Sequence, residues 1–149
     1  MKPKFKETLN RKAKFEYTVI RTIEAGIVFK GSEVKSILSG HGSLLGSFAK
    51  IIKEEVYVFD FYIPNTLNQN WNKHDENSPK KLLLKKKEIL SLKKETELHQ
   101  NYTLVPMRLY YSEANKLKVE LALCFGRNKA DKREYIKERD SKREAREFV

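Results

Sequence analysis

The chain of 149 residues has little of what marks several classes of protein. Its single cysteine, Cys124, excludes an internal disulfide and a metal site built from several cysteines. No apolar run approaches the roughly 20 residues that cross a bilayer. The basic N-terminus lacks the apolar stretch of a secretory signal. We therefore expect a cytoplasmic protein.

Motifs of catalysis are scarce too. The histidines His41, His74 and His99 lie far apart and show no metal-ligand spacing. The sequence contains neither of the common glycine-rich loops that cradle phosphates. A nuclease site built from Asp60, Asp75 and glutamates is the remaining enzymatic alternative, but no pattern in the sequence favours it. The sequence thus predicts a protein that is not an enzyme and uses no metal or cofactor.

Positive charge is what the chain has in excess. It carries 31 Lys and Arg against 20 Asp and Glu, a net charge of +11, which exceeds what solubility requires. Nucleic acid, an anionic membrane surface or an acidic protein would suit such a charge. A lone lysine run, such as the one at residues 85–94, is usually only a solvated surface. Here the excess also extends to both termini, which favours RNA as the partner.

Residues 126–149 form the most basic segment. They contain nine Lys or Arg against six Asp or Glu, and their few apolar residues do not follow helical spacing. Such a segment cannot offset its ordering entropy with a core of its own. We expect residues 1–9 to be a flexible arm, residues 10–125 to be one folded domain, and residues 126–149 to be a tail that is disordered when free.

The apolar pattern predicts a mainly β protein. Runs rich in β-branched and aromatic residues predict six short strands, at 15–23, 27–29, 48–52, 56–63, 102–111 and 117–125. Glu24 to Gly26 predicts a turn, and Pro106 requires an edge or a bulge. Strands this short favour a closed barrel of the oligonucleotide/oligosaccharide-binding (OB) type, whose ligands include single-stranded and irregular RNA.

Other elements complete this prediction. One helix opens at Gly31 with Ser32 as its N-cap, and a second spans residues 85–99, so two or three helices flank the barrel. In the strand at 56–63, Phe61 is expected to share a face with Tyr57 and Phe59. A polar loop covers residues 65–79, where a tryptophan at 71 could stack on a base but more often packs on its own domain.

Several short motifs occur together and in a fixed order. They are Asn10-Arg11-Lys12-Ala13, Glu24-Ala25-Gly26-Ile27, Glu33-Val34-Lys35-Ser36, Lys81-Leu82-Leu83-Leu84, Leu104-Val105-Pro106, Lys118-Val119-Glu120-Leu121, and Asp131-Lys132-Arg133-Glu134 with Ile136-Lys137-Glu138-Arg139. In this order and spacing they closely resemble the SsrA-binding protein family, also called small protein B, over about residues 10–147. The resemblance implies an OB-like barrel with flanking helices.

The resemblance also implies a function. The family is the bacterial cytoplasmic partner of transfer-messenger RNA in trans-translation, the rescue of ribosomes stalled on messages that lack a stop codon. Its barrel binds the tRNA-like domain of that RNA, and its tail enters the decoding centre and mRNA channel of the small subunit. Contact with elongation factor Tu through the RNA complex, and a monomeric state, are further expectations.

The resemblance also implies roles for individual residues. Asn10, Glu24, Leu83 and Lys118 stand at positions that contact or support the tRNA-like domain. The positions matched to the ribosome-binding tail, together with basic and aromatic residues suited to RNA there, are Gly126, Asp131, Lys132, Arg133, Tyr135, Lys137 and Arg139.

Residues of these sets also have simpler explanations. Asn10 equally suits a turn or a cap, Glu24 an exposed turn, and Leu83 the core. If Leu83 lies on a strand, it faces opposite to both neighbouring leucines, so one face of that strand can be open to RNA.

The tail departs from the family pattern at three places. Ala130 stands where many members carry His or Tyr, Asn128 where Lys is common, and Ser141 where an aromatic is common. Tyr135 is our candidate to stack on ribosomal RNA instead. A general basic RNA-binding or ribosome-associated chaperone is the alternative function, and an RNA phosphodiesterase is a third.

Overall fold

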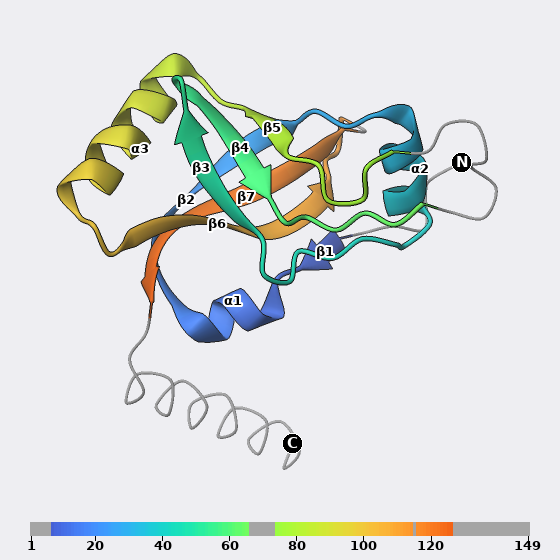
Figure 1. Ribbon diagram of the computed structural model, residues 1–149, viewed down its shortest axis with the longest axis horizontal. Coiled ribbons are helices and arrows are strands. Elements are labelled where there is room, and N and C mark those ends of the chain that lie inside the picture. The colour runs from blue at the N-terminus through green and yellow to red at the C-terminus, as the bar shows by residue number, and fades with distance from the viewer. Residues whose placement is uncertain (1–6, 66–73, 115, 127–149) are drawn as a thin grey trace, which may run out of the picture.

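A computed structural model describes residues 7–65, 74–114 and 116–126, and within them seven strands form one antiparallel sheet (Figure 1). The strands are β1 Glu7–Leu9, β2 Tyr17–Ile27, β3 Phe48–Ile52, β4 Glu55–Phe59, β5 Lys80–Leu83, β6 Tyr102–Tyr111 and β7 Leu117–Gly126. Their order is β1-β6-β3-β4-β5-β2-β7, and pairing of β6 with β7 closes six of them into a ring. The short β1 shares the edge of β6 with β3. The predicted OB-like barrel is confirmed.

Three helices flank the ring in the described part of the chain: α1 Arg11–Glu16, α2 Gly31–Leu38 and α3 Lys86–Leu98. Helices α2 and α3 lie at opposite ends of the barrel, and α1 lies on a third side near β1 (Figure 1). The sequence predicts no element at β1, α1 or β5. Within the described residues, none of the helices is long and apolar enough to span a membrane.

Apolar residues pack in two clusters on opposite faces of the sheet. The larger lies inside the ring and includes Val119, Leu121 and Leu123 of β7. The smaller lies outside, where Ala122 and Cys124 pack against Ala13 of α1. The alternation of β7 thus buries residues of both its faces, one set in each cluster.

The turn predicted at Glu24 to Gly26 is wrong, because β2 runs unbroken through this segment to Ile27. Gly26 instead allows Leu83 of the neighbouring strand to lie close to its backbone. A Cβ built at Gly26 would lie 3.3 Å from the Cβ of Leu83 on the neighbouring strand, which is tighter than ordinary van der Waals contact.

Two further local predictions are corrected. The N-cap of α2 is Lys30 rather than Ser32, and the Lys30 backbone N–H donates to the Glu33 carboxylate at 2.8 Å. Strand β4 ends at Phe59, since Asp60 adopts a φ of 60°. This left-handed residue reverses the alternation, so Phe61 is buried whereas Phe59 is only half-buried.

The bulge expected at Pro106 is confirmed. The register of β6 on β7 shifts between Pro106 and Arg108. A proline cannot donate to the ladder, so the irregularity accommodates it within a paired strand.

Candidate nucleic-acid interface

Three strands bring three of the predicted RNA-binding residues together around Gly26 of β2. Gly26 is paired with Leu83 of β5 on one side and with Lys118 of β7 on the other. Glu24 lies two residues earlier on β2, so its side chain is on the same face of the sheet as position 26. Residues separated by up to 94 positions in the sequence therefore form one surface.

Leu83 is the apolar centre of this surface. Its side chain is 55% exposed, whereas its neighbour Leu82 is buried in the barrel core. The expectation that one face of this segment is open is confirmed. An exposed leucine can pack on a sugar or on the face of a base, and its cost in water is removed when a partner covers it.

Glu24 is oriented by a residue that the sequence did not single out. The Tyr110 side chain hydrogen-bonds to Glu24, and burial together with this bond raises the pKa of Tyr110 to about 12. A tyrosine hydroxyl is protonated at neutral pH, so Tyr110 is the donor of this bond and the Glu24 carboxylate is the acceptor. Tyr110 also pairs with Lys118 across β6 and β7, so it links both charged members of the surface.

Arg108 lies on the same face of the sheet as Tyr110, two residues earlier on β6. Its guanidinium lies 3.2 Å from the Glu120 carboxylate, 3.1 Å from the Glu7 carboxylate, and 4.2 Å from the centre of the Tyr110 ring. These two carboxylates raise the pKa of Arg108, because both favour its charged form. They engage Arg108, while Lys116 and Lys118 make no ion pair with any described residue.

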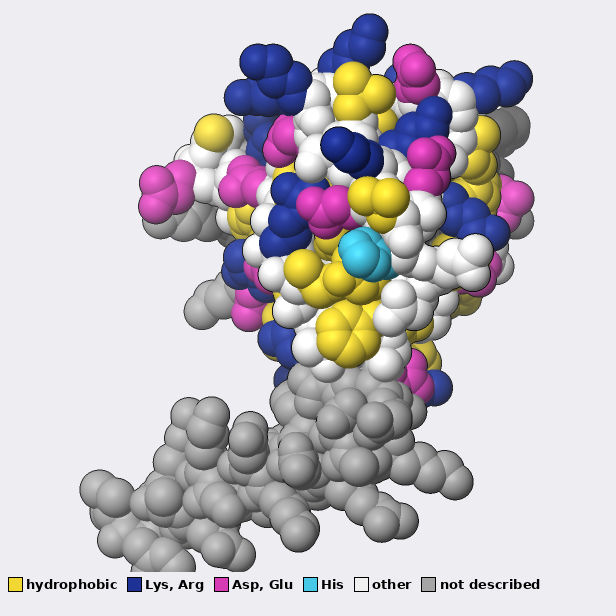
Figure 2. Space-filling view, turned by 90° about the vertical axis from the view of Figure 1, so that its left-hand side faces the viewer, with side chains coloured by type: hydrophobic (Ala, Val, Ile, Leu, Met, Phe, Trp, Pro, Cys, Tyr) yellow, Lys and Arg dark blue, Asp and Glu magenta, His cyan; other side chains and the backbone are white. Residues whose placement is uncertain are grey.

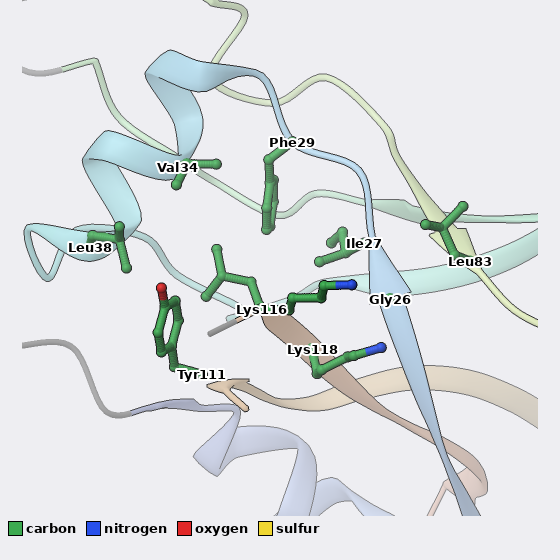
Figure 3. A pocket seen from close by; sticks show the side chains of 10 residues that line it. Gly26, Ile27, Phe29, Val34, Leu38, Leu83, Tyr111, Lys116 and Lys118 are labelled. Atoms are coloured by element: carbon green, nitrogen blue, oxygen red, sulfur yellow. The ribbon is translucent and has the colours of Figure 1, made fainter. Parts of the chain in front are cut away.

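A cavity of about 400 Å³ opens beside Leu83 (Figure 3). Its walls are mainly apolar, from Ile27, Phe29 and Val34, and Lys116 and Lys118 stand at its edge. In Figure 3 the ends of both lysine side chains extend toward the side on which Gly26 lies. An apolar hollow bordered by cations suits a base with its attached phosphate.

Leu83 also borders a second hollow, of about 740 Å³, whose lining includes many charged residues. It is bordered by Lys53 and Glu54 of the β3–β4 turn and by Lys85 and Lys86 at the start of α3. Both turn residues have a positive φ, as a two-residue hairpin requires. The turn thus places its lysine next to those of α3.

Asn10 lies apart from this surface and is 3% exposed. Its side-chain Nδ2 donates to the Pro106 carbonyl at 2.9 Å, and its Oδ1 accepts from the Ala13 N–H at 3.3 Å. It is therefore the N-cap of α1 and fixes that helix to β6. The cap explanation is confirmed, since both ends of the side-chain amide bond within the protein.

The remaining predicted residues belong to the C-terminal segment. Gly126 is exposed and ends β7, where the ladder pairs it with Tyr17. The others lie outside the described residues, as does Trp71; they are Asp131, Lys132, Arg133, Tyr135, Lys137 and Arg139.

His74 contributes to the barrel rather than to this surface. It is 6% exposed, its Nε2 lies 2.7 Å from the Ile63 carbonyl, and its Nδ1 lies 2.9 Å from the Ser32 hydroxyl. A carbonyl can only accept, so Nε2 donates to it. The described residues contain no group of three or more His, Cys, Asp or Glu side chains placed to hold a metal ion.

Comparisons with known proteins agree on one family. The sequence model of a family described as SmpB protein matches residues 7–149. An SsrA-binding protein from Treponema denticola is 46% identical over 135 residues, covering 91% of this chain and 86% of that protein. One from Parvibaculum lavamentivorans is 44% identical over 136 residues, covering 91% of this chain and 82% of that protein.

A solved structure extends the likeness to three dimensions. Its subject is described as "tmRNA-SmpB: a journey to the center of the bacterial ribosome", and it superposes with a TM-score of 0.68 at 35% identity, covering 87% of this chain and 94% of that chain. The fold, the match over residues 7–149 and the identity to these relatives lead to one conclusion: the chain belongs to the SmpB family of SsrA-binding proteins.

Proposed function

We propose that this protein is a non-catalytic adaptor that binds the tRNA-like domain of transfer-messenger RNA and delivers it to stalled ribosomes. The observation that carries the proposal is the convergence of Glu24, Leu83 and Lys118 around Gly26. The family resemblance implies a role for all three residues, and three different strands bring them to one exposed, lysine-bordered surface. The names of the relatives and of the solved complex support the same assignment.

Each residue has a distinct part in this proposal. Lys118 and Lys116 neutralise phosphates, Leu83 covers a sugar or base face, and Glu24, held by Tyr110, accepts from a base amino group or a 2′-hydroxyl. A carboxylate would repel phosphate, so its position amid lysines favours base or ribose contact over backbone contact.

The tail completes the proposed mechanism. Gly126 is the junction, and Asp131, Lys132 and Arg133 with Tyr135, Lys137 and Arg139 bind the decoding centre and the empty mRNA channel. Ordering of the tail on binding makes docking conditional on an empty channel. We place the protein in the cytoplasm as a monomer, with elongation factor Tu reached through the RNA.

Competition binding at near-physiological salt tests the proposal. Labelled tRNA-like domain is displaced from the full-length protein by the unlabelled domain, by tRNA or by a hairpin of equal length. We expect only the cognate domain to compete well. Equal competition by all three would instead support the general basic RNA-binding chaperone.

Variants locate the binding surface in the same assay. Lys118→Ala and Leu83→Ala should each weaken binding by about 1–2 kcal/mol, or roughly 5- to 30-fold, since each removes one phosphate or stacking contact. Lys35→Ala is the matched control, because this exposed lysine of α2 borders neither hollow. Equal losses of affinity in Lys118→Ala and Lys35→Ala would show that RNA binding depends on general positive charge and not on this surface.

A further inference from the structure

Three aromatic rings stack where α3, β6 and β7 meet, at the end of the barrel from which the C-terminal segment leaves. The centres of the His99 and Tyr102 rings are 4.3 Å apart with an angle of 29° between their planes. Those of Tyr102 and Phe125 are 6.2 Å apart at 20°. We call His99, Tyr102 and Phe125 the ring stack.

The backbone holds the ring stack in place. Tyr102 and Phe125 are directly opposite each other in the β6–β7 ladder. The Tyr102 N–H donates to the His99 carbonyl at 3.0 Å, and His99 is the C-cap of α3. The rings are therefore preorganised, and a ligand that stacks on them meets little ordering cost.

Packing alone does not account for this arrangement. Tyr102 packs partly against the barrel core, but Phe125 is only half-buried and His99 is exposed. Leu98, next to His99, is 68% exposed. Figure 2 views this end of the molecule and shows hydrophobic side chains gathered beside a histidine, with lysine and arginine side chains around them.

Cations share a cleft with the middle ring of the stack, Tyr102. A cleft of about 360 Å³ lies between β3 and α3, and its border includes Tyr102, Lys50, Lys93 and Glu97. The Lys50 ammonium lies 5.4 Å from the centre of the Phe48 ring, which keeps it close to the surface of β3. Two lysines against one glutamate leave the cleft positive, so it suits an anionic group.

The ring stack is separate from the surface around Gly26. Phe125 and Lys118 are both on β7, seven residues apart, a distance of about 23 Å along a strand. The stack lies instead beside Gly126, where the basic segment 127–149 begins.

We propose that the ring stack, with Lys50 and Lys93, is a second RNA site that binds an unpaired nucleotide. The base stacks on the outward ring faces, and its phosphate lies against the two lysines. Stacking needs no particular base, because every base has an aromatic face. The positive border favours RNA over an apolar peptide as the occupant.

Fluorescence of a 2-aminopurine base within a single-stranded oligoadenylate of 12 nucleotides tests the proposal on the full-length protein, with a blunt RNA duplex of equal length as the second probe. We expect Phe125→Ala to weaken single-strand binding by about tenfold and to abolish quenching of the fluorescence. Duplex binding should not change. Phe125→Tyr should preserve both signals, because it keeps the ring.

Two controls keep the outcome decisive. Tyr62→Ala removes an aromatic side chain of 42% exposure elsewhere on the surface and should change neither signal. Thermal melting shows that each variant is folded, and His99→Ala repeats the test at the exposed ring of the stack. Unchanged quenching in folded Phe125→Ala, or equal losses on both probes, would overturn the proposal. The proposal would also be overturned if Phe125→Ala lost binding to a 12-residue polyglutamate peptide but kept its binding to the single strand.

Discussion

At the residue scale, the structure separates side chains that hold the barrel from those available to a partner. Asn10 and Leu83 were both selected as RNA contacts, yet Asn10 is 3% exposed and Leu83 is 55% exposed. The difference follows from their contacts: both polar ends of the Asn10 amide bond within the protein, whereas more than half of the Leu83 side chain is left exposed. Asn10 is thus expected to affect stability before binding.

Replacing Asn10 tests that distinction. Asn10→Ala removes the cap of α1 and leaves the Pro106 carbonyl without its side-chain donor, so the free energy of unfolding should fall by about 1–2 kcal/mol. Urea denaturation measures it. Asn10→Asp keeps the accepting oxygen but not the donor, and should lose as much or more, since a carboxylate would face the carbonyl. Full stability in Asn10→Ala would contradict the capping role.

At the element scale, α2 is attached to the barrel by buried polar contacts. Glu33 of α2 and Lys80 of β5 form an ion pair in which both side chains are at most 3% exposed. The Ser36 hydroxyl of the same helix donates to the Pro64 carbonyl at 2.6 Å. Since α2 supplies Val34 and Leu38 to the apolar hollow beside Leu83, these contacts determine the shape of that hollow.

Breaking the buried pair should be costly, whereas replacing both partners should not. Lys80→Met alone leaves a buried carboxylate without its partner, so unfolding free energy should fall by about 3–5 kcal/mol. The double change Lys80→Met with Glu33→Leu should recover much of this loss, because no buried charge remains; the part not recovered includes the hydrogen bond from the Lys30 N–H to Glu33. Denaturation curves of both variants measure the difference. If the double variant is no more stable than Lys80→Met, the loss comes from packing rather than from the unpaired charge.

At the scale of the whole molecule, the proposed RNA surface and the point where the basic tail begins lie at opposite ends of the β2–β7 pair. The surface lies around Gly26, whereas the tail begins at Gly126, at the far end of the β2–β7 pair, where Tyr17 is the partner of Gly126. The division of labour proposed above therefore has a spatial basis: changes in one region need not disturb the other.

Substitutions in the tail test this division. Alanine at Asp131, Lys132 and Arg133 together should leave affinity for the tRNA-like domain within about twofold and abolish rescue of stalled ribosomes, since few phosphate contacts of the barrel are lost. Binding and in vitro trans-translation are the two measurements. Alanine at Lys142, Arg143 and Glu144 removes the same charges further along the tail and is the control. Loss of RNA binding in the first variant would contradict separate roles.

The sequence by itself determined the class of fold and the residues worth testing. Runs rich in β-branched and aromatic residues predicted β3, β6 and β7, because such side chains favour the extended backbone of a strand. The alternation of side chains along a strand also predicted that Leu83 faces opposite to Leu82. The excess of lysine and arginine favoured an anionic partner, and the ordered motifs indicated the family.

Only the tertiary structure decided how those residues are combined. The local sequence around Gly26 predicts a turn. In the structure Gly26 lies in a strand, and a side chain at this position would come too close to Leu83 on the neighbouring strand. Tyr110 gives no local signal, yet strand register places it next to both Glu24 and Lys118. The ring stack also joins residues from three elements. Register and ring closure depend on contacts between distant segments, and a local pattern does not contain them.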